Sequence, residues 1–243
     1  MTGLTDMHCH IIPCVDDGAS TMEEVRALLR MEYQEGVRRI ILTPHYRKGM
    51  FEASAEEVKK QFKKVRRAAE QLNLDIELYL GREFYADSHL SDRLKQEECL
   101  TLAGTKNILV EFSYGQTFQK IRSRVYELMA EGYIPVVAHI ERYECLRANI
   151  ELVEELVEMG AHMQVNASPI IGEDGLRQKR FCAKLMKRDL IYFVGTDAHD
   201  SKSRIPNLGK CAEYMERKMG TDYAKKILID HPGMLLKKIR RDK

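Results

Sequence analysis

The stretch LTDMHCH, residues 4–10, joins a short β-rich run to two histidines that stand one residue apart. A similar arrangement returns near the other end of the chain in GTDAH, residues 195–199, where a β-rich run ends in Asp197 and His199. Because side chains alternate along a strand, the two members of a pair such as His8 and His10 lie on one side of the backbone. Cys9 therefore points to the opposite side, and we expect it to pack in the core.

Short β-rich runs alternate with amphipathic helical patterns along most of the chain. Seven runs are predicted strands: Leu4–His8, Arg39–Thr43, Ile76–Leu80, Ile108–Phe112, Ile134–Ala138, His162–Asn166 and Ile191–Thr196. Such alternation implies parallel strands linked by right-handed crossovers. Seven units of this kind predict a closed or nearly closed α/β barrel in a single domain, residues 1–243, and the chain from about residue 208 onward is predicted to be helical.

Two of the predicted helices begin with a capping box, in which a serine is followed three residues later by a glutamate. The first helix is expected to open at Ser20 with Glu23 and to stop near Gly36. The second is expected to open at Ser54 with Glu57.

Composition excludes several classes of protein. The 243 residues have a formal net charge of +2, which gives no electrostatic case for binding nucleic acid. No apolar run reaches the length of a membrane span, and the N-terminus lacks the basic and then apolar regions of a signal peptide. We therefore expect a cytoplasmic protein.

The six cysteines include no Cys-x-x-Cys pair and are expected to be free thiols: Cys9, Cys14, Cys99, Cys145, Cys182 and Cys211. Two of them, Cys182 with Arg188 and Cys211 with Arg217, match the spacing of the phosphate loop of cysteine-based phosphatases. That loop needs free backbone N–H groups, whereas both segments lack glycine and are predicted helices, whose amides are used internally. Chance is the better interpretation of both matches.

Side chains that bind metals gather where the predicted strands end. Six of the seven strands end in such a residue, and the first and last carry pairs. The residues are His8, His10, His45, Glu83, Glu111, His139, Asp197 and His199, with Asp16 and Asp17 in the loop after the first strand. Because the carboxyl ends of the strands of a parallel barrel open on one face, we expect these side chains to converge there.

Imidazoles and carboxylates that converge in this way would repel one another unless cations neutralise them. Mixed nitrogen and oxygen ligands suit Mn²⁺, Fe or Zn²⁺, and enough ligands are present for two or three ions. A single strand-end histidine is usually structural, as is an isolated His-x-His or Asp-x-His, so the prediction depends on their joint occurrence. His89, His162 and His231 have no such placement, and we expect them in solvent or in the core.

Four segments resemble the PHP (polymerase and histidinol phosphatase) family of metal-dependent phosphoesterases. They are HCH (residues 8–10), the glutamate after the third strand, AHIERY (138–143) and DAH (197–199). The resemblance is closer to one branch, the manganese-dependent protein-tyrosine phosphatases of bacterial capsule and exopolysaccharide operons. DMHCHIIPCVDDGAS (6–20), TPHYRKGMF (43–51), HIERY (139–143) and MQVNASPI (163–170) are similar to segments of that branch and span most of the chain in the same order.

This resemblance implies a distorted (β/α)₇ barrel of the TIM type with a trinuclear site, most simply loaded with Mn²⁺. It places one metal on His8, His10, Glu83 and Asp197; a second on Glu83, Glu111 and His139; and a third on Asp17, His45 and His199. It also implies that Arg142 and Arg204 clamp the phosphate.

The resemblance further implies the substrate and the partner. The substrate would be phosphotyrosine on a partner tyrosine autokinase of a polysaccharide operon, whose dephosphorylation regulates capsular or extracellular polysaccharide synthesis. The metals would supply hydroxide at neutral pH for in-line attack on phosphorus, with the arginines neutralising charge on the phosphoryl oxygens.

Three alternatives stay open. The first is a phosphatase of the same superfamily that acts on histidinol phosphate or another small molecule, which the metal site alone does not distinguish. The second is an amidohydrolase-type barrel, which usually bridges its metals with a carbamylated lysine where this chain has Glu83. The third is a scaffold that binds a kinase and keeps its metals only for stability.

Overall fold

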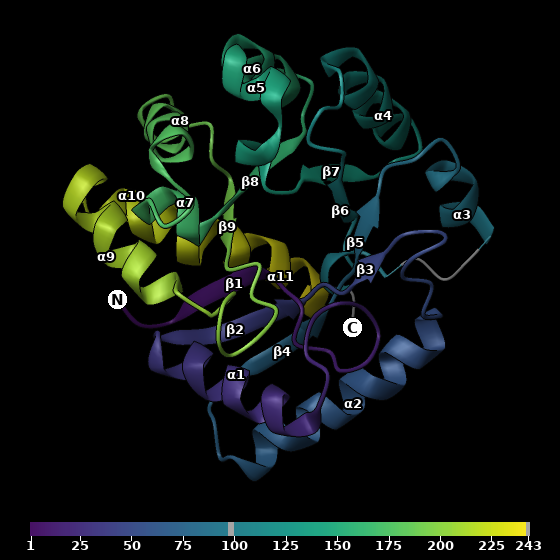
Figure 1. Ribbon diagram of the computed structural model, residues 1–243, viewed down its shortest axis with the longest axis vertical. Coiled ribbons are helices and arrows are strands. Elements are labelled where there is room, and N and C mark those ends of the chain that lie inside the picture. Colours follow the sequence, from purple (N-terminus) through teal and green to yellow (C-terminus); the bar gives the residue numbers. More distant parts are fainter. Residues whose placement is uncertain (97–99, 242–243) are drawn as a thin grey trace.

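A ring of parallel strands lies at the centre of the molecule in the computed structural model, which describes residues 1–96 and 100–241 (Figure 1). The strands are β1 (Leu4–Cys9), β2 (Val37–Leu42), β3 (His45–Tyr46), β4 (Glu77–Leu80), β5 (Glu83–Tyr85), β6 (Asn107–Glu111), β7 (Ile134–Val137), β8 (His162–Asn166) and β9 (Phe193–Gly195). Hydrogen bonds order them as β1-β2-β4 and as β3-β5-β6-β7-β8-β9. Cys99, one of the predicted free thiols, lies outside the described residues.

Two of the predicted strands, Arg39–Thr43 and Ile76–Leu80, form as β2 and β4, and each is followed by a second short strand. β2 and β3 are separated at Pro44, which has no backbone N–H to donate. β4 and β5 are separated at Gly81 and Arg82. Backbone hydrogen bonds span both breaks, because the Gly81 N–H donates to the Leu42 carbonyl at 2.8 Å and the Glu83 N–H to the Pro44 carbonyl at 3.1 Å. Each such pair of strands therefore occupies one position of the ring.

The ring is closed between β1 and the segment that follows β9. The Asp197 N–H donates to the His8 carbonyl at 2.7 Å, and the His10 N–H donates to the Ala198 carbonyl at 2.8 Å. Within the described residues the barrel thus has the seven strand positions that the sequence predicts. The predicted α/β barrel is confirmed.

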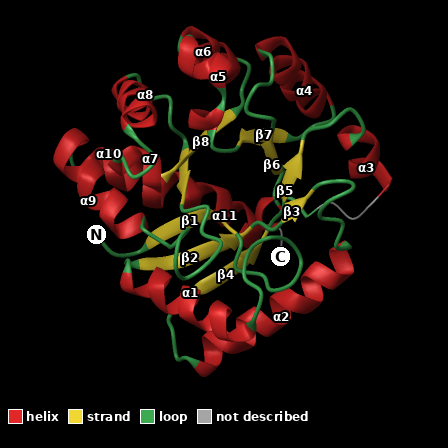
Figure 2. Cartoon of the chain, in the orientation of Figure 1, coloured by secondary structure: helices red, strands yellow, loops and turns green. Residues whose placement is uncertain are grey.

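Helices surround the ring (Figure 2). They are α1 (Met22–Gln34), α2 (Ala55–Gln71), α3 (Leu90–Gln96), α4 (Phe118–Ala130), α5 (Glu144–Ala148), α6 (Glu151–Glu158), α7 (Ala167–Ile171), α8 (Leu176–Lys187), α9 (Leu208–Met219), α10 (Thr221–Lys225) and α11 (His231–Arg241). The capping box at Ser54 and Glu57 is confirmed. The one predicted at Ser20 is wrong by one residue, because the Thr21 hydroxyl accepts the Glu24 N–H while Glu24 accepts the Ser20 N–H.

Helix α11 crosses the ring and packs against one end of it (Figure 1). Its Leu235 and Leu236 form an apolar cluster with strand residues that include Met7 of β1 and Phe193 of β9. The cluster also contains Leu102, which precedes β6, so this is the end where strands begin. Burial of these side chains fills that end of the barrel and leaves the carboxyl ends of the strands for polar groups.

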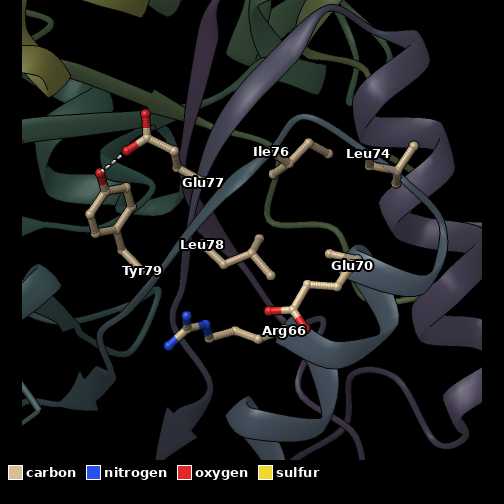
Figure 3. Close-up of a pocket in the computed structure, with 8 residues that line it drawn as sticks. Arg66, Glu70, Leu74, Ile76, Glu77, Leu78 and Tyr79 are labelled. Carbon is tan, nitrogen blue, oxygen red and sulfur yellow. Dashed lines mark hydrogen bonds between the residues drawn. The ribbon is translucent and has the colours of Figure 1, made fainter.

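A separate hollow of about 290 Å³ lies on the outside of the barrel between α2 and β4 (Figure 3). Arg66 and Glu70 of α2 line it together with Glu77 of β4, whose carboxylate accepts a hydrogen bond from the Tyr79 hydroxyl. Among the helices of the described ranges, none has the length and apolar character needed to cross a membrane.

Candidate metal centre

The structure brings all nine predicted metal ligands together at the carboxyl ends of the strands. Their potential ligand atoms form three overlapping groups, each within 4.8 Å. The groups are His10, Asp17, His45 and His199; His8, His10 and Asp197; and His45, Glu83 and Glu111. The ninth residue, His139, joins them through its Nε2 atom, which lies 2.9 Å from Glu83 Oε1 and 3.8 Å from Glu111 Oε2.

Glu83 stands in the middle of the cluster and is fully buried. Its Oε2 atom lies 2.9 Å from His45 Nδ1, 3.1 Å from His8 Nε2 and 3.4 Å from His10 Nε2, while Oε1 faces His139. Burial alone would raise the pKa of this carboxyl, but the imidazoles of His8 and His45 hold it well below its ordinary value. Glu83 is therefore a carboxylate that faces four imidazoles.

The outer ring nitrogens of three histidines are already engaged. Nδ1 of His8 lies 3.3 Å from Gln164 Oε1, Nδ1 of His10 lies 2.8 Å from Asp16 Oδ2, and Nδ1 of His139 lies 3.4 Å from the Tyr143 hydroxyl. Gln164 and Asp16 accept at Nδ1 and so favour a proton there on His8 and His10, whereas the Tyr143 hydroxyl can donate to or accept from His139. The Nε2 atoms of His8 and His10 lie 3.1 Å apart and both face the cluster, where they could be ligands of one cation.

Several buried atoms at the centre lack a hydrogen bond of acceptable geometry, among them Glu83 Oε2, His45 Nδ1 and His199 Nε2. Glu83 Oε2 and His45 Nδ1 lie only 2.9 Å apart, so they are close without being aligned for hydrogen bonding. Buried polar atoms left in this way are costly, and cations held by these residues would satisfy them. The donor set of imidazoles and carboxylates fits a divalent metal.

The electrostatics of the cluster also favour cations. Burial would lower the pKa of His10, but the Asp16 carboxylate beside it raises the pKa well above the ordinary value. Burial acts in the same direction on His45, yet Glu83 raises its pKa to about 10. These two imidazoles therefore favour the protonated form among the carboxylates, whereas burial lowers the pKa of His139 and of His199.

Backbone geometry at two predicted ligands is unusual. His139 has φ +33° and Asp197 has φ +53°, both in the left-handed region that costs a non-glycine residue about 1–3 kcal/mol. Just before Asp197, a Cβ atom on Gly195 would lie 2.5 Å from the Cβ of His8, so only glycine lets β9 approach β1 this closely. The backbone is therefore strained at the residues that present these two side chains, as is common at functional sites.

The two predicted phosphate-binding arginines lie at the edge of the cluster on Asp197. Arg142 Nη2 and Arg204 Nη2 donate to Asp197 Oδ2 at 2.7 and 2.8 Å. The other oxygen, Oδ1, lies 3.3 Å from His10 Nε2 and 3.6 Å from His8 Nε2. Burial would raise the pKa of Asp197, but Arg142 and His8 keep it well below the ordinary value. Asp197 thus joins the histidines on one side to the arginines on the other.

Sequence reasoning missed some residues that support the centre. Asp16 was noted beside Asp17 but given no role, and its carboxylate accepts bonds from His10 Nδ1 and from the His45 and Gly18 N–H groups. Tyr143, Gln164 and Asn166 were not singled out at all. The tyrosine belongs to HIERY and the two amides to MQVNASPI, so the only available signal was their presence in those segments.

The residues that were predicted to lie elsewhere do so. His89 is exposed, while His162 and His231 stack on the ring of Tyr192, where β8 and β9 begin. Cys9 is buried in the core cluster.

The cysteine-phosphatase alternative does not fit the fold. Cys182 lies within α8 and Cys211 within α9, and both side chains are fully buried. The Arg188 that completes the first spacing pairs with Glu154 at 2.9 Å. Both matches are therefore chance spacings within helices, as predicted.

A parallel barrel with histidines and carboxylates gathered at the carboxyl ends of its strands is the architecture of metal-dependent hydrolases. Within that class, the chain belongs to the CpsB/CapC family of capsular polysaccharide synthesis, whose model matches residues 4–237. The family resemblance predicted from the sequence is confirmed.

The chain is 34% identical to tyrosine-protein phosphatase CpsB of Streptococcus pneumoniae over 238 residues, which covers 96% of this chain and 98% of that protein. It is also 34% identical to tyrosine-protein phosphatase YwqE of Bacillus subtilis, covering 90% and 86% of the two chains. A crystal structure from a study of YwqE and CpsB, described as unique metal-dependent tyrosine phosphatases, superposes with a TM-score of 0.86 at 29% identity and covers 96% of this chain and 92% of that one.

The histidinol phosphate phosphatase of Lactococcus lactis, solved with zinc, superposes with a TM-score of 0.58 at 16% identity over 92% of this chain and 94% of that one. At this identity the similarity establishes the shared fold alone. The metal-dependent relatives and the three ligand groups together support a site for divalent metal in this chain.

Proposed function

We propose that this chain, as a single domain over residues 1–243, is a metal-dependent protein-tyrosine phosphatase that hydrolyses phosphotyrosine on a partner tyrosine autokinase and so regulates capsular or extracellular polysaccharide synthesis. One observation carries the proposal: nine potential metal ligands converge beside two arginines whose guanidinium groups lie within reach of the same carboxylate. The family and the names of the relatives agree with it. The cytoplasm is the proposed location.

The three ligand groups support a site for as many as three divalent cations, of which Mn²⁺ is the proposed ion. We assign one ion to His8, His10, Glu83 and Asp197; a second to Glu83, Glu111 and His139; and a third to Asp17, His45 and His199. When bound, such cations lower the pKa of water and neutralise charge on a phosphoryl group.

The residues of this chain have distinct tasks in that reaction. Glu83 holds neighbouring histidines in one geometry, and Asp16 and Tyr143 orient His10 and His139 from behind. Arg142 and Arg204 hold the phosphoryl oxygens by fork-shaped, charge-assisted hydrogen bonds that strengthen as charge develops in the transition state. A phenolate is a fairly good leaving group, so protonation of the tyrosyl oxygen is less demanding than for an alkyl ester.

The deciding experiment is hydrolysis of a phosphotyrosine peptide by metal-stripped protein, with Mn²⁺, Zn²⁺ or Mg²⁺ added back and histidinol phosphate assayed in parallel. Peptide cleavage that metal restores and that His8→Ala abolishes is the expected result. Cleavage of histidinol phosphate alone would keep the metal centre and overturn the substrate. Absence of phosphatase activity with every metal would overturn the enzymatic function and favour the scaffold alternative.

A further inference from the structure

Strand β8 differs from its neighbours in what it presents at the carboxyl end of the barrel. Among the described strands of the ring, it is the one whose end supplies none of the predicted metal ligands. It presents two amides instead, Gln164 and Asn166, which are two residues apart and therefore on the same side of the strand. Both residues are buried, with exposed fractions of 0% for Gln164 and 2% for Asn166.

These two amides connect three of the predicted ligands. Gln164 Oε1 lies 2.7 Å from the His139 backbone N and 3.3 Å from His8 Nδ1. Gln164 Nε2 lies 3.0 Å from Asn166 Oδ1, and Asn166 Nδ2 lies 2.9 Å from Asp197 Oδ2. The chain of contacts therefore links His8 and His139 through the two amides to Asp197.

The direction of every bond in this chain follows from one backbone group. The His139 N–H only donates, so the Gln164 atom that faces it must be the carbonyl oxygen. Gln164 then presents its NH₂ group to Asn166, which must turn its own oxygen toward it and its NH₂ group toward Asp197. Because Gln164 Oε1 is an acceptor, His8 must carry its proton on Nδ1.

We propose that Gln164 and Asn166 are positioning residues that fix His8 in the Nδ1–H tautomer and hold Asp197 so that its Oδ1 atom faces the centre. This inference rests on the proposed metal centre. With Nδ1 protonated, the Nε2 atom of His8 presents its lone pair to the cluster, 3.1 Å from Glu83 Oε2. Asn166 saturates the outer oxygen of Asp197 together with the two arginines, which leaves Oδ1 free for a cation.

The first test measures Mn²⁺ binding by isothermal titration calorimetry, with no substrate present. Gln164→Met and Asn166→Leu keep the size of each side chain and remove its hydrogen bonds. We expect each to weaken Mn²⁺ binding about 10–100-fold, the usual effect of losing a group that orients a metal ligand. Asn107→Leu is the matched control, because Asn107 is also a buried amide on a barrel strand but lies at the opposite end, in β6. It should bind Mn²⁺ like the wild type even if its stability falls.

The second test reads the tautomer directly. Long-range ¹H–¹⁵N spectra of the metal-free protein, recorded at mildly alkaline pH, distinguish the two ring nitrogens, and His8→Ala identifies the signals of His8. The wild type should show the Nδ1–H tautomer, and Gln164→Met should populate the other. Gln164→Glu keeps an acceptor for His8 and His139 but cannot donate to Asn166, so it should retain the tautomer while losing Mn²⁺ affinity.

The outcomes separate this inference from the proposed function. Wild-type protein that binds no metal would overturn the metal centre itself. Wild-type protein that binds Mn²⁺, with Gln164→Met and Asn166→Leu binding equally well, would overturn the positioning role alone. If Gln164→Met does not fold, Gln164→Glu and Asn166→Leu still decide the matter, because unchanged affinity in these two variants contradicts the proposal.

Discussion

Replacement of Arg142 by alanine should have two separable effects, because this guanidinium contacts a predicted ligand and also lies where a phosphate would bind. In the metal-free protein, Arg142 Nη2 donates to Asp197 Oδ2 at 2.7 Å, and the carboxylate is 3% exposed. A hydrogen bond to a charged group contributes about 1.5–3 kcal/mol. Arg204 and Asn166 still donate to the same oxygen, so the loss of about 3–5 kcal/mol expected for an unpaired buried charge should not be reached.

The larger effect should fall on catalysis. Loss of one preformed donor to a developing oxyanion lowers the rate about 10²–10³-fold, or about 2.7–4 kcal/mol in the barrier. We therefore expect kcat/KM for a phosphotyrosine peptide to fall by this factor in Arg142→Ala, with the free energy of unfolding in urea lowered by about 1.5–3 kcal/mol. Arg142→Lys should recover part of the loss, because it restores the charge without the planar fork.

The matched control is Arg188→Ala, which removes a surface guanidinium that pairs with Glu154 at 2.9 Å. It should leave kcat/KM unchanged. A folded Arg142→Ala protein whose kcat/KM stays close to that of the wild type would refute the phosphate-binding role. The scaffold alternative would be favoured if Arg142→Ala keeps the wild-type effect on polysaccharide synthesis although its peptide hydrolysis is lost.

Three further expectations concern the supporting groups. Tyr143→Phe leaves the buried Phe112 N–H without its acceptor at 3.0 Å, so the free energy of unfolding in urea should fall by about 1–3 kcal/mol. Mn²⁺ binding should also weaken, because His139 loses the hydroxyl beside its Nδ1 atom. Cys182→Ser should keep full activity in the peptide assay, because burial raises the pKa of this thiol well above its ordinary value and no phosphate loop surrounds it; loss of activity without unfolding would revive the cysteine mechanism. Mn²⁺ binding should release protons and strengthen as pH rises, since His45 holds its proton up to a pKa of about 10; calorimetry in buffers of different ionisation enthalpy measures the release. The same raised pKa stabilises the metal-free fold below about pH 6.5, and that contribution disappears as pH rises through about 10. The free energy of unfolding of His45→Gln, measured against pH beside that of the wild type, checks this.

Much of the fold could be predicted because strand and helix patterns in this chain are local. The period-two arrangement at His8 and His10 and the capping box at Ser54 each depend on residues only a few positions apart. The short strands β3 and β5, which follow the second and third predicted strands, could not be predicted in the same way. They depend on how the strand around Pro44 bends to meet its neighbour at Glu83, which is a property of the closed ring.

The same distinction separates the predicted ligands from the groups that support them. The ligands could be predicted because histidine and carboxylate side chains recur at strand ends, and these ends converge on one face of a parallel barrel. Gln164 carries no such signal, because glutamine is an ordinary residue in a strand and its partner His8 lies 156 positions away. Asp16 came closer to being predicted, because it stands next to Asp17. The choice between the two requires knowing which carboxylate lies beside Nδ1 of His10.

Asp197 links the two halves of the proposed chemistry in a way that neither half reveals alone. Its Oδ1 atom faces His8 and His10, while Oδ2 accepts bonds from Arg142 and Arg204. A phosphoryl group that takes these guanidinium groups must compete with a carboxylate whose charge is already shared with the metal side. A cation held beside Oδ1 would draw negative charge away from Oδ2 and so weaken the bonds that Oδ2 accepts from Arg142 and Arg204, which would leave the arginines free for phosphate. Metal should therefore strengthen phosphate binding by more than the charge of the cations alone would. Asp197→Asn should reduce this difference in phosphate affinity between the metal-loaded and the metal-free protein.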